Sequence, residues 1–411
     1  MRVLIVGSGG REDAIAWKLR QSPRCEQLYV APGNGGTMRL GQPVPIAAKD
    51  IDGIVAFAKK EHIDLVVVGP EAPLADGLVD DLSKAGIRSF GPSSYGAELE
   101  ASKIFTKTRC VRWNIPTAYF DFAGTYEVAK LSIKKNGFRV IKADGLCGGK
   151  GAIVTKTTRQ ALAAAHDFLV KKSEGPAGSR IVMEEKLSGP EWSVMAIIRA
   201  GINIAVLPVV RDYKRINDNN QGLNTGGMGA FSPVSDVSDA MLVRIKEEIL
   251  LPTVNGMAKR GTPFDGVLYA GIMLTKKGPK LIEYNVRFGD PECQVLMRRL
   301  ESDAFSLFET PSQALWSKEA VVCVVLTSRG YPGKPEIGYP IEGIYEAEQV
   351  PGVVVFHAGT KQEGSTYYTS GGRILNVTAS GATLAEARER AYVAVQCIKF
   401  EGMHYRSDIA A

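Results

Sequence analysis

The sequence lacks the long apolar runs, paired cysteines and one-sided charge that mark several classes of protein. Its longest apolar runs, such as Ala320–Leu326, are far shorter than the roughly 20 residues that a membrane-spanning helix needs. Six cysteines lie far apart without a CxxC pair, which disfavours a zinc or disulfide framework and fits a reducing, cytoplasmic location. A net charge of +6 over 411 residues is too small to indicate a nucleic-acid-binding protein. Val3–Val6 is too short for a signal peptide and predicts a first strand instead. Membrane, secreted, fibrous and disordered classes are excluded.

What is present indicates a multidomain protein of α/β and α+β type. At about 150 residues per domain, the length predicts two to four domains. Residues 1–102 alternate short apolar strands with helical patterns, which is typical of a doubly wound parallel sheet in a Rossmann-like domain. The pattern changes over 103–188 and again over 189–314, and a small α/β domain is expected over 315–411.

Several individual elements are predicted from apolar periodicity and from turn and capping residues. They are helices over 75–84 and 239–259, a strand over 204–210, a loop over 219–230, a hairpin pairing 267–274 with 280–285, and a capping box of Thr383 and Glu386.

A strand, a glycine loop and a second strand over 139–155 form the first candidate site. Lys142 lies on the first strand and Lys150 lies in the loop, among Gly145, Gly148, Gly149 and Gly151. Glycines let backbone N–H groups converge on phosphate oxygens, which lysines neutralise. The spacing differs from a Walker A loop. A plain hairpin tip with surface lysines is the alternative.

The segment Glu283–Glu292 is the second candidate. On a strand, Glu283 and Asn285 point to one face, and two oxygen donors suit Mg²⁺, which leaves other positions for phosphate and water. Arg287 would share that face and could grip an anion bidentately. Asp290 and Pro291 predict an N-cap and first helical position, so a helix N-terminus would point to the same region. A charged strand edge with an ordinary cap is the alternative.

Three further segments carry polar groups at the ends of predicted strands. Met183–Leu187 could offer its backbone to an adenine, and Glu191 could take ribose hydroxyls, although a solvated acidic turn is the simpler interpretation. The loop Gly7–Glu12 opens a helix and can hold a phosphate, but it lacks the third glycine and the acid of a dinucleotide site. Glu71 follows a neighbouring strand. Asp212, Lys214, Arg215 and Asn224–Gly229 suggest either a ligand loop or a flexible insertion.

Together these segments resemble the ATP-grasp ligases, and closely resemble the glycinamide ribonucleotide synthetase (phosphoribosylamine–glycine ligase) family. The resemblance covers essentially the whole chain. The stretches that carry it, in family order, are VLIVGSGGRE, VVVGPEAPLADGL, FGPSSYGAELEASKIFTK, VIKADGLCGGKG, NTGGMGAFSP, LIEYNVRFGDPE and the terminal HYRSDIA.

The resemblance implies ligation of glycine to 5-phosphoribosylamine with ATP through an acyl phosphate, in purine biosynthesis. It implies a cytoplasmic monomer that acts on small molecules and binds neither nucleic acid nor membrane. Residues 103–188 would be the small ATP-grasp domain with its lid, and residues 189–314 the large one with a Mg²⁺ site that could also take Mn²⁺. The implied ATP contacts are Lys103, Lys142, Gly148, Gly149, Lys150, Gly151, Glu184, Glu185, Leu187 and Glu191. The implied substrate contacts are Gly9, Gly10, Glu12 and Glu71 for phosphoribosylamine in the N-terminal crevice, with Asp212, Asn224, Thr225, Gly226, Gly227 and Arg287 for glycine and the acyl phosphate. Glu283 and Asn285 would hold the metal, and Arg287 and Lys142 would stabilise charge without a covalent nucleophile.

The chain departs from the family pattern at a few positions. They are Asp13, Cys147, Gly148, Tyr213, Asn219 and Asn220, in the N-terminal, lid and substrate loops. The isolated histidines and cysteines have no catalytic neighbours and are expected to be structural or surface residues. Three alternatives stay open: another ATP-grasp ligase or carboxylase of purine metabolism, a nicotinamide-dependent dehydrogenase, and a non-catalytic ATP-binding regulator.

Overall fold

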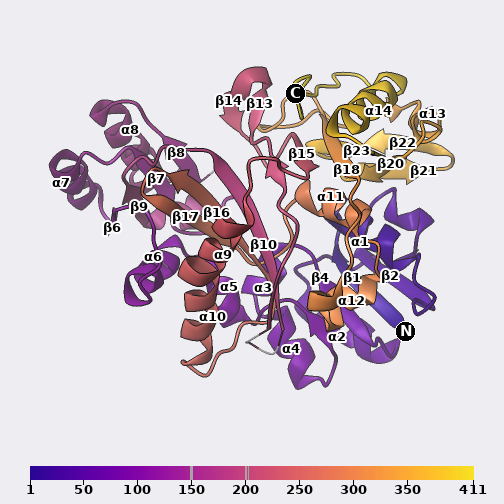
Figure 1. The fold of residues 1–411 in the computed structure, drawn as a ribbon, viewed down its shortest axis with the longest axis horizontal. Coiled ribbons are helices and arrows are strands. Elements are labelled where there is room, and N and C mark those ends of the chain that lie inside the picture. Colours follow the sequence, from indigo (N-terminus) through magenta and orange to yellow (C-terminus); the bar gives the residue numbers. More distant parts are fainter. Residues whose placement is uncertain (149–150, 200, 202) are drawn as a thin grey trace.

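The N-terminal sheet consists of parallel strands in the order β3-β2-β1-β4-β5. The computed structural model describes residues 1–148, 151–199, 201 and 203–411 (Figure 1). The strands are β1 (Arg2–Gly7), β2 (Gln27–Pro32), β3 (Gln42–Pro43), β4 (Leu65–Val68) and β5 (Ser89–Phe90). Val3 and Ile5 of β1 face helix α1 (Gly10–Leu19), whereas Leu4 and Val6 face α2 (Ile51–Lys60) and α4 (Leu78–Lys84). The predicted doubly wound sheet is confirmed.

Two antiparallel sheets make up the middle of the chain. The smaller has the order β6-β9-β7-β8, and α7 (Tyr126–Asn136) and α8 (Thr158–Leu169) pack on one of its faces. The larger has the order β11-β10-β16-β17. The strands are β6 (Phe120–Ala123), β7 (Val140–Ala143), β8 (Ala152–Val154), β9 (Ile181–Glu184), β10 (Glu191–Arg199), β11 (Asn203–Val206), β16 (Gly266–Thr275) and β17 (Gly278–Asn285). The predicted β16–β17 hairpin is confirmed, with a register shift beside Gly271.

The C-terminal sheet has the order β12-β15-β18-β23-β20 and is covered by α14 (Leu384–Cys397). Its strands are β12 (Arg211–Asp212), β15 (Gly229–Ser232), β18 (Ala320–Thr327), β20 (Val353–His357) and β23 (Arg373–Gly381), with a small sheet of β19 (Pro340–Ile341), β22 (Thr366–Thr369) and β21 (Thr360–Glu363) and helix α13 (Ile344–Glu348) beside it. β12 and β15 come from the middle of the sequence, so hydrogen bonds of this sheet cross the boundary expected at residue 315.

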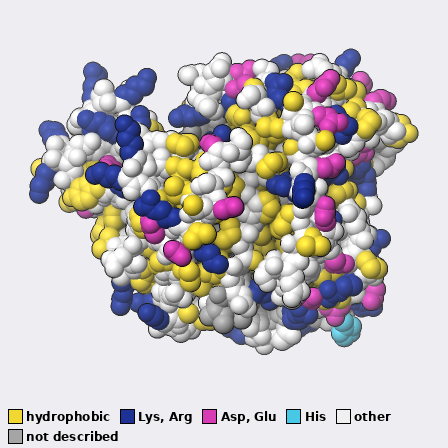
Figure 2. All heavy atoms as spheres, in the orientation of Figure 1, with side chains coloured by type: hydrophobic (Ala, Val, Ile, Leu, Met, Phe, Trp, Pro, Cys, Tyr) yellow, Lys and Arg dark blue, Asp and Glu magenta, His cyan; other side chains and the backbone are white. Residues whose placement is uncertain are grey.

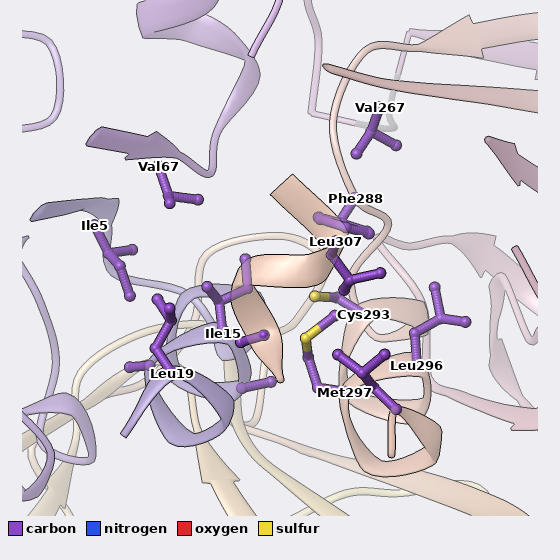
Figure 3. Packing of buried hydrophobic residues seen from close by; sticks show 14 of the residues in the cluster. Ile5, Ile15, Leu19, Val67, Val267, Phe288, Cys293, Leu296, Met297 and Leu307 are labelled. Atoms are coloured by element: carbon purple, nitrogen blue, oxygen red, sulfur yellow. The ribbon is translucent and has the colours of Figure 1, made fainter. Parts of the chain in front are cut away.

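A shared core joins the N-terminal sheet to a segment nearly 300 residues later in the sequence. Helices α11 (Glu292–Arg299) and α12 (Ala304–Glu309) pack against α1 and the sheet. Figure 3 shows Ile15 and Leu19 of α1 near Cys293 and Met297 of α11. The order of elements along the chain therefore does not map onto separately packed domains.

Some predicted elements differ in the structure. Gly77, with φ of 92°, separates α3 (Glu71–Ala75) from α4, so the helix predicted over 75–84 is interrupted. The strand predicted over 204–210 ends at Val206, and the loop predicted over 219–230 contains β14 (Gln221–Asn224), which pairs with β13 (Arg215–Asn217).

The helix predicted over 239–259 is α9 (Asp239–Ile245) and α10 (Leu251–Ala258), joined by a π-helical segment. Helices α5 (Ser94–Ala101) and α6 (Lys103–Arg112) link the N-terminal sheet to the middle of the chain. Thr383 caps α14 through the N–H of Glu386, but the Glu386 carboxylate accepts from Ala382 rather than completing the capping box.

The six cysteines are all free, as expected without a disulfide framework. Across the described ranges, no helix combines the length and apolar character needed to cross a bilayer. His357 is fully buried and hydrogen-bonded to Thr360, and His404 contacts the carbonyl of Ile216, which agrees with structural roles.

Gly256 tests how closely α10 approaches the end of α6. A Cβ atom at this glycine would lie 2.2 Å from the Trp113 indole, and we expect Gly256→Ala to cost about 1–3 kcal/mol through overpacking. At Gly124 a Cβ would meet nothing within 4 Å, so Gly124→Ala is the matched control. Unfolding followed by tryptophan fluorescence measures both. Equal stability of the two variants would contradict the packing.

Candidate active site

One cleft of about 890 Å³ lies between the small sheet, the large sheet and the N- and C-terminal bodies. Figure 2 shows a notch that separates the rest of the molecule from the lobe that carries α7 and α8. Lys and Arg side chains gather over this lobe. Most of the predicted site residues line the cleft: Gly9, Glu12, Glu71, Lys103, Lys142, Gly148, Gly151, Glu184, Glu185, Leu187, Glu191, Asp212, Asn224, Thr225, Gly226, Glu283, Asn285 and Arg287. Of the other described candidates, Gly10 and Gly227 lie behind this wall, and Gly149 and Lys150 fall outside the described residues.

A buried carboxylate between two lysines forms the floor of the cleft on the small sheet. Glu184 of β9 ion-pairs with Lys107 of α6 at 3.1 Å and with Lys142 of β7 at 3.2 Å. Burial opposes ionisation of all three groups. The lysines nevertheless lower the pKa of Glu184, and Glu184 raises the pKa of Lys142, whereas burial lowers that of Lys107. Lys142 therefore remains protonated and faces the cleft. The Glu184 carboxylate is occupied by its ion pairs with Lys107 and Lys142.

The root of the glycine loop is fastened to α6. Lys103 Nζ donates to the carbonyl of Gly145 at 3.0 Å. The Asp144 carboxylate accepts from the Ile104 N–H at 2.8 Å and from Arg180 at 2.6 Å. Gly148 has φ of 54°, in the left-handed region that favours glycine. A Cβ atom at this position would meet nothing within 4 Å. The hydrogen bonds of Asp144 and Gly145 therefore hold the start of the glycine loop against α6.

Glu283 and Asn285 extend from β17 into the same cleft. Burial would raise the pKa of Glu283, but the charges of Lys142 and Lys214 hold it below its usual range, so the carboxylate is ionised. The Asn285 amide oxygen accepts from Arg287 Nη2 at 3.3 Å. An anionic carboxylate and an amide oxygen on one strand face form a hard-oxygen donor set, which suits Mg²⁺.

Arg287 is already bonded to protein groups. Its Nε donates to Glu71 at 3.1 Å, and its Nη2 donates to Glu100 at 2.9 Å. Its Nη1 donates to the carbonyl of Phe288 at 3.2 Å. The structure thus places this guanidinium in a carboxylate cluster rather than free to grip an anion bidentately, and it links β17 to Glu71 of the N-terminal body.

The N-terminus of α1 is occupied by carboxylates. Glu12 accepts from the Gly9 N–H at 2.6 Å, and Asp290 accepts from the Arg11 N–H at 3.2 Å. Asp290 therefore caps α1, and Pro291 stands at the N-cap of α11, which corrects the predicted Asp290 cap and Pro291 first helical position. Both carboxylates compete with a phosphate for this helix end. At Gly10 a Cβ would lie 2.3 Å from Asn376, so this glycine is needed for packing against the C-terminal sheet.

Another wall of the cleft is formed by β12 and the segment that joins it to β15. Asp212 and Lys214 line the cleft, and Lys214 ion-pairs with Glu191 of β10. Burial raises the pKa of Asp212 to about 7, although Lys214 lowers it. Thr225 caps the turn of this segment by donating to the carbonyl of Lys214 at 2.9 Å. Glu191, the predicted ribose contact, is thus already paired with Lys214 of this segment.

Sequence reasoning missed several cleft residues. Lys107 lies one helical turn after Lys103, a spacing that could have shown it on the same face of α6. Glu100 and Glu292 lie in stretches that carry the family resemblance but were given no role there, and Tyr269 and Arg373 carry no local motif. Tyr269 donates to Glu292 at 2.6 Å, and Arg373 of the C-terminal sheet donates to the carbonyl of Gly226 at 2.8 Å and pairs with Asp290. Only the fold brings these residues to the site.

Comparison with known proteins gives consistent matches along the chain. Family models described as phosphoribosylglycinamide synthetase match as the N domain over residues 1–100, the ATP-grasp (A) domain over 101–293 and the C domain over 321–411. A phosphoribosylamine–glycine ligase of Brucella melitensis is 46% identical, with 100% of this chain and 97% of that protein covered. The trifunctional purine biosynthetic protein adenosine-3 of Gallus gallus is 44% identical over 99% of this chain and 42% of that protein.

Solved structures agree. The structure of phosphoribosylamine–glycine ligase from Thermotoga maritima matches with a TM-score of 0.86 and 33% identity over 100% of both chains. A biotin carboxylase from Campylobacter jejuni matches with a TM-score of 0.73 at 15% identity, covering 98% of this chain and 92% of that one, which indicates a common fold only.

The buried Glu184 gives a pH-dependent prediction. Glu184→Gln removes the carboxylate that pairs with both buried ammonium groups and should cost about 3–5 kcal/mol of stability. Because the folded protein lowers the pKa of Glu184, the stabilisation is fully present above the ordinary value of 4.5 and is lost as pH falls further. Unfolding measured from pH 7 downward should show the gap between wild type and variant closing. Glu185→Gln, which breaks a half-exposed pair with Lys280, is the control and should cost under about 1 kcal/mol.

Proposed function

The chain belongs to the phosphoribosylglycinamide synthetase family, and on that basis we propose how its cleft carries out the reaction. The enzyme ligates glycine to 5-phosphoribosylamine with ATP, through glycyl phosphate, and yields glycinamide ribonucleotide, ADP and phosphate in purine biosynthesis. The observation that supports the site assignment is the single cleft that Lys142, Glu283, Asp212 and the Gly9 loop all line.

ATP would bind across the small sheet. Lys103, Lys142 and the lid from Gly148 to Gly151 would contact its phosphates. The backbone of β9 through Leu187 would frame the adenine, with Glu185 beside it and Glu191 at the ribose. Glu184 would act through Lys142 and Lys107, because its carboxylate lies between them. Glu184 already holds the two ammonium groups in place. Triphosphate oxygens would then become a second anionic partner of these lysines.

Glu283 and Asn285 would hold Mg²⁺, with Mn²⁺ as a substitute. The bound cation would neutralise phosphate oxygens of ATP. The donor set fits it, since Glu283 is ionised and Asn285 presents an amide oxygen. Arg287 would keep Asn285 and Glu71 in place and add positive charge near the transferring phosphoryl group.

Both chemical steps need positioning more than a protein nucleophile. A glycine carboxylate oxygen attacks the γ-phosphorus, and the bond to the ADP oxygen breaks. The amine of phosphoribosylamine then attacks the glycyl carbon, phosphate leaves, and the amine loses a proton. Asp212 would attract the glycine ammonium, and Asn224–Gly227 would approach its carboxylate. Glu12, Glu71 and the Gly9–Gly10 turn would hold phosphoribosylamine.

We further propose that the chain works in the cytoplasm as a monomer, on small molecules rather than on nucleic acid or membranes. Its six free cysteines suit a reducing compartment. The domain limits 1–102, 103–188, 189–314 and 315–411 are retained as functional units, although the packed cores cross them.

The metal assignment is tested by ADP release. Wild type should release ADP only with Mg-ATP, glycine and phosphoribosylamine together. Asn285→Ala removes one oxygen ligand, and we expect turnover to fall by about 100-fold or more, with partial recovery at high Mg²⁺. Asn255→Ala, on the exposed side of α10, is the matched control. Unchanged turnover of folded Asn285→Ala would remove Asn285 from the metal site.

Asp212 gives a second test through pH. Its pKa of about 7 means that the carboxylate gains its charge as pH rises through 7. Attraction for the glycine ammonium grows in the same direction, so the KM for glycine should fall between pH 6 and 8, by up to about tenfold. Asp212→Asn should raise this KM and flatten its pH dependence. If the profile of Asp212→Asn matched that of wild type, glycine would not bind there.

A further inference from the structure

The last residues of the chain pack against the back of the wall that carries Asp212. We call residues 404–410 the tail and residues 212–227 the substrate hairpin, which contains β13 and β14. Figure 1 places the C-terminus beside these two strands. Neither the assigned reaction nor the proposed ligand contacts use the tail.

A fully buried arginine forms the centre of this contact. Arg406 donates from Nη1 to the carbonyl of Arg215 at 3.2 Å and to Asn220 Oδ1 at 3.1 Å. Its Nε and Nη2 form a fork on the Asp408 carboxylate at 2.7 and 2.6 Å. Its guanidinium lies 4.7 Å from the centre of the Tyr213 ring. One side chain thus holds the first strand of the substrate hairpin, β13, and the turn that follows it.

Neighbouring tail residues continue the contact over the turn of the hairpin. Ser407 donates from its backbone and its hydroxyl to Asp218, at 2.9 and 2.5 Å. Asp408 accepts from the Asn219 N–H at 2.8 Å, and Ala410 donates to the Tyr213 hydroxyl at 3.0 Å. Asn219 and Asn220 have φ of 56° and 54°, a left-handed conformation that asparagine tolerates better than most residues.

The other side of the tail is fixed to the C-terminal sheet and to α14. His404 exchanges backbone hydrogen bonds with Thr327 of β18 at 2.8 and 3.0 Å. Tyr392 of α14 donates to the carbonyl of Arg406 at 2.7 Å, and Arg388 donates to that of Ser407 at 2.8 Å. The tail therefore connects the C-terminal sheet to the substrate hairpin. The hairpin lines the cleft through Asp212, Lys214 and Asn224, and also through Arg215 and Asn220, the two residues that Arg406 binds.

We propose that the tail is a positioning clamp, and Arg406 a positioning residue, that sets the glycine-binding wall of the cleft. The proposal rests on the function proposed above for Asp212. Without the clamp the hairpin keeps its strand ends in the C-terminal sheet but loses the contacts that fix its turn. Small displacements at a wall that orients a reacting carboxylate are costly, whereas Lys103 and Lys142, which would face ATP, lie on α6 and β7, outside the hairpin.

The test separates two Michaelis constants. Arg406→Lys keeps a positive charge but cannot make the fork, and we expect the KM for glycine to rise about tenfold or more while that for ATP changes less than about twofold. Arg329→Lys is the matched control, since Arg329 also lies in the C-terminal body but forms its ion pairs with Glu336 and Glu401 at the exposed surface. A loss of stability alone would lower activity without separating the two constants.

A second variant covers failure of Arg406→Lys to fold. Asp218→Ala removes the acceptor for Ser407 on the exposed turn, and it should raise the KM for glycine about threefold or more. An unchanged KM for glycine in a folded Arg406→Lys, or in Asp218→Ala if the former does not fold, would overturn the clamp. Asp212→Asn measured alongside decides the ligand assignment separately, because it acts on the cleft side of the hairpin.

Discussion

The cleft depends on the burial of Glu184 between Lys107 and Lys142. A site for a triphosphate must gather positive charge, and buried ammonium groups without a counter-charge would either unfold the small sheet or lose their protons. Glu184 satisfies both lysines at 3.1 and 3.2 Å and leaves Lys142 protonated. Glu283 contributes from the other sheet, since its charge also raises the pKa of Lys142. The two sheets are therefore coupled electrostatically across the cleft before any substrate enters.

Charged side chains on the N-terminal side of the cleft are likewise paired with groups of opposite charge. Arg287 joins Glu71 and Glu100, and Asp290 is shared among the Arg11 N–H, Gln294 and Arg373. These ion pairs and hydrogen bonds join segments that are far apart in the sequence. The cleft is therefore formed where the N-terminal, middle and C-terminal parts of the chain meet. The shared core of α1 with α11 and α12 holds these bodies in register. A phosphate at the α1 N-terminus would compete there with the carboxylates of Glu12 and Asp290, which already accept from its N–H groups.

Much of this was predictable from local pattern. The parallel sheet follows from apolar strands alternating with helices, and the Glu283–Asn285 pair follows from the period of two along β17. The shared C-terminal sheet was not, because β12 and β15 are short, and β15 joins the sheet by pairing with β18, about 90 residues later in the sequence. The ion-pair partners of Glu184 and Arg287 could not be predicted either, since a motif identifies a charged side chain but not the groups that neutralise it. Arg373 has no motif, and Glu100 lies in a quoted stretch that gives no sign of its partner, so only packing reveals their place in the site.

The tail extends this reasoning to the end of the chain. A loop that approaches a small substrate must be accurate, yet the substrate hairpin has few apolar side chains with which to fix itself. Polar contacts have to do so, and they are effective only when buried and complete. Arg406 meets both conditions, with no exposed surface and three partners in different segments. The departures at Tyr213, Asn219 and Asn220 all lie in this contact, since each of the three is hydrogen-bonded to the tail.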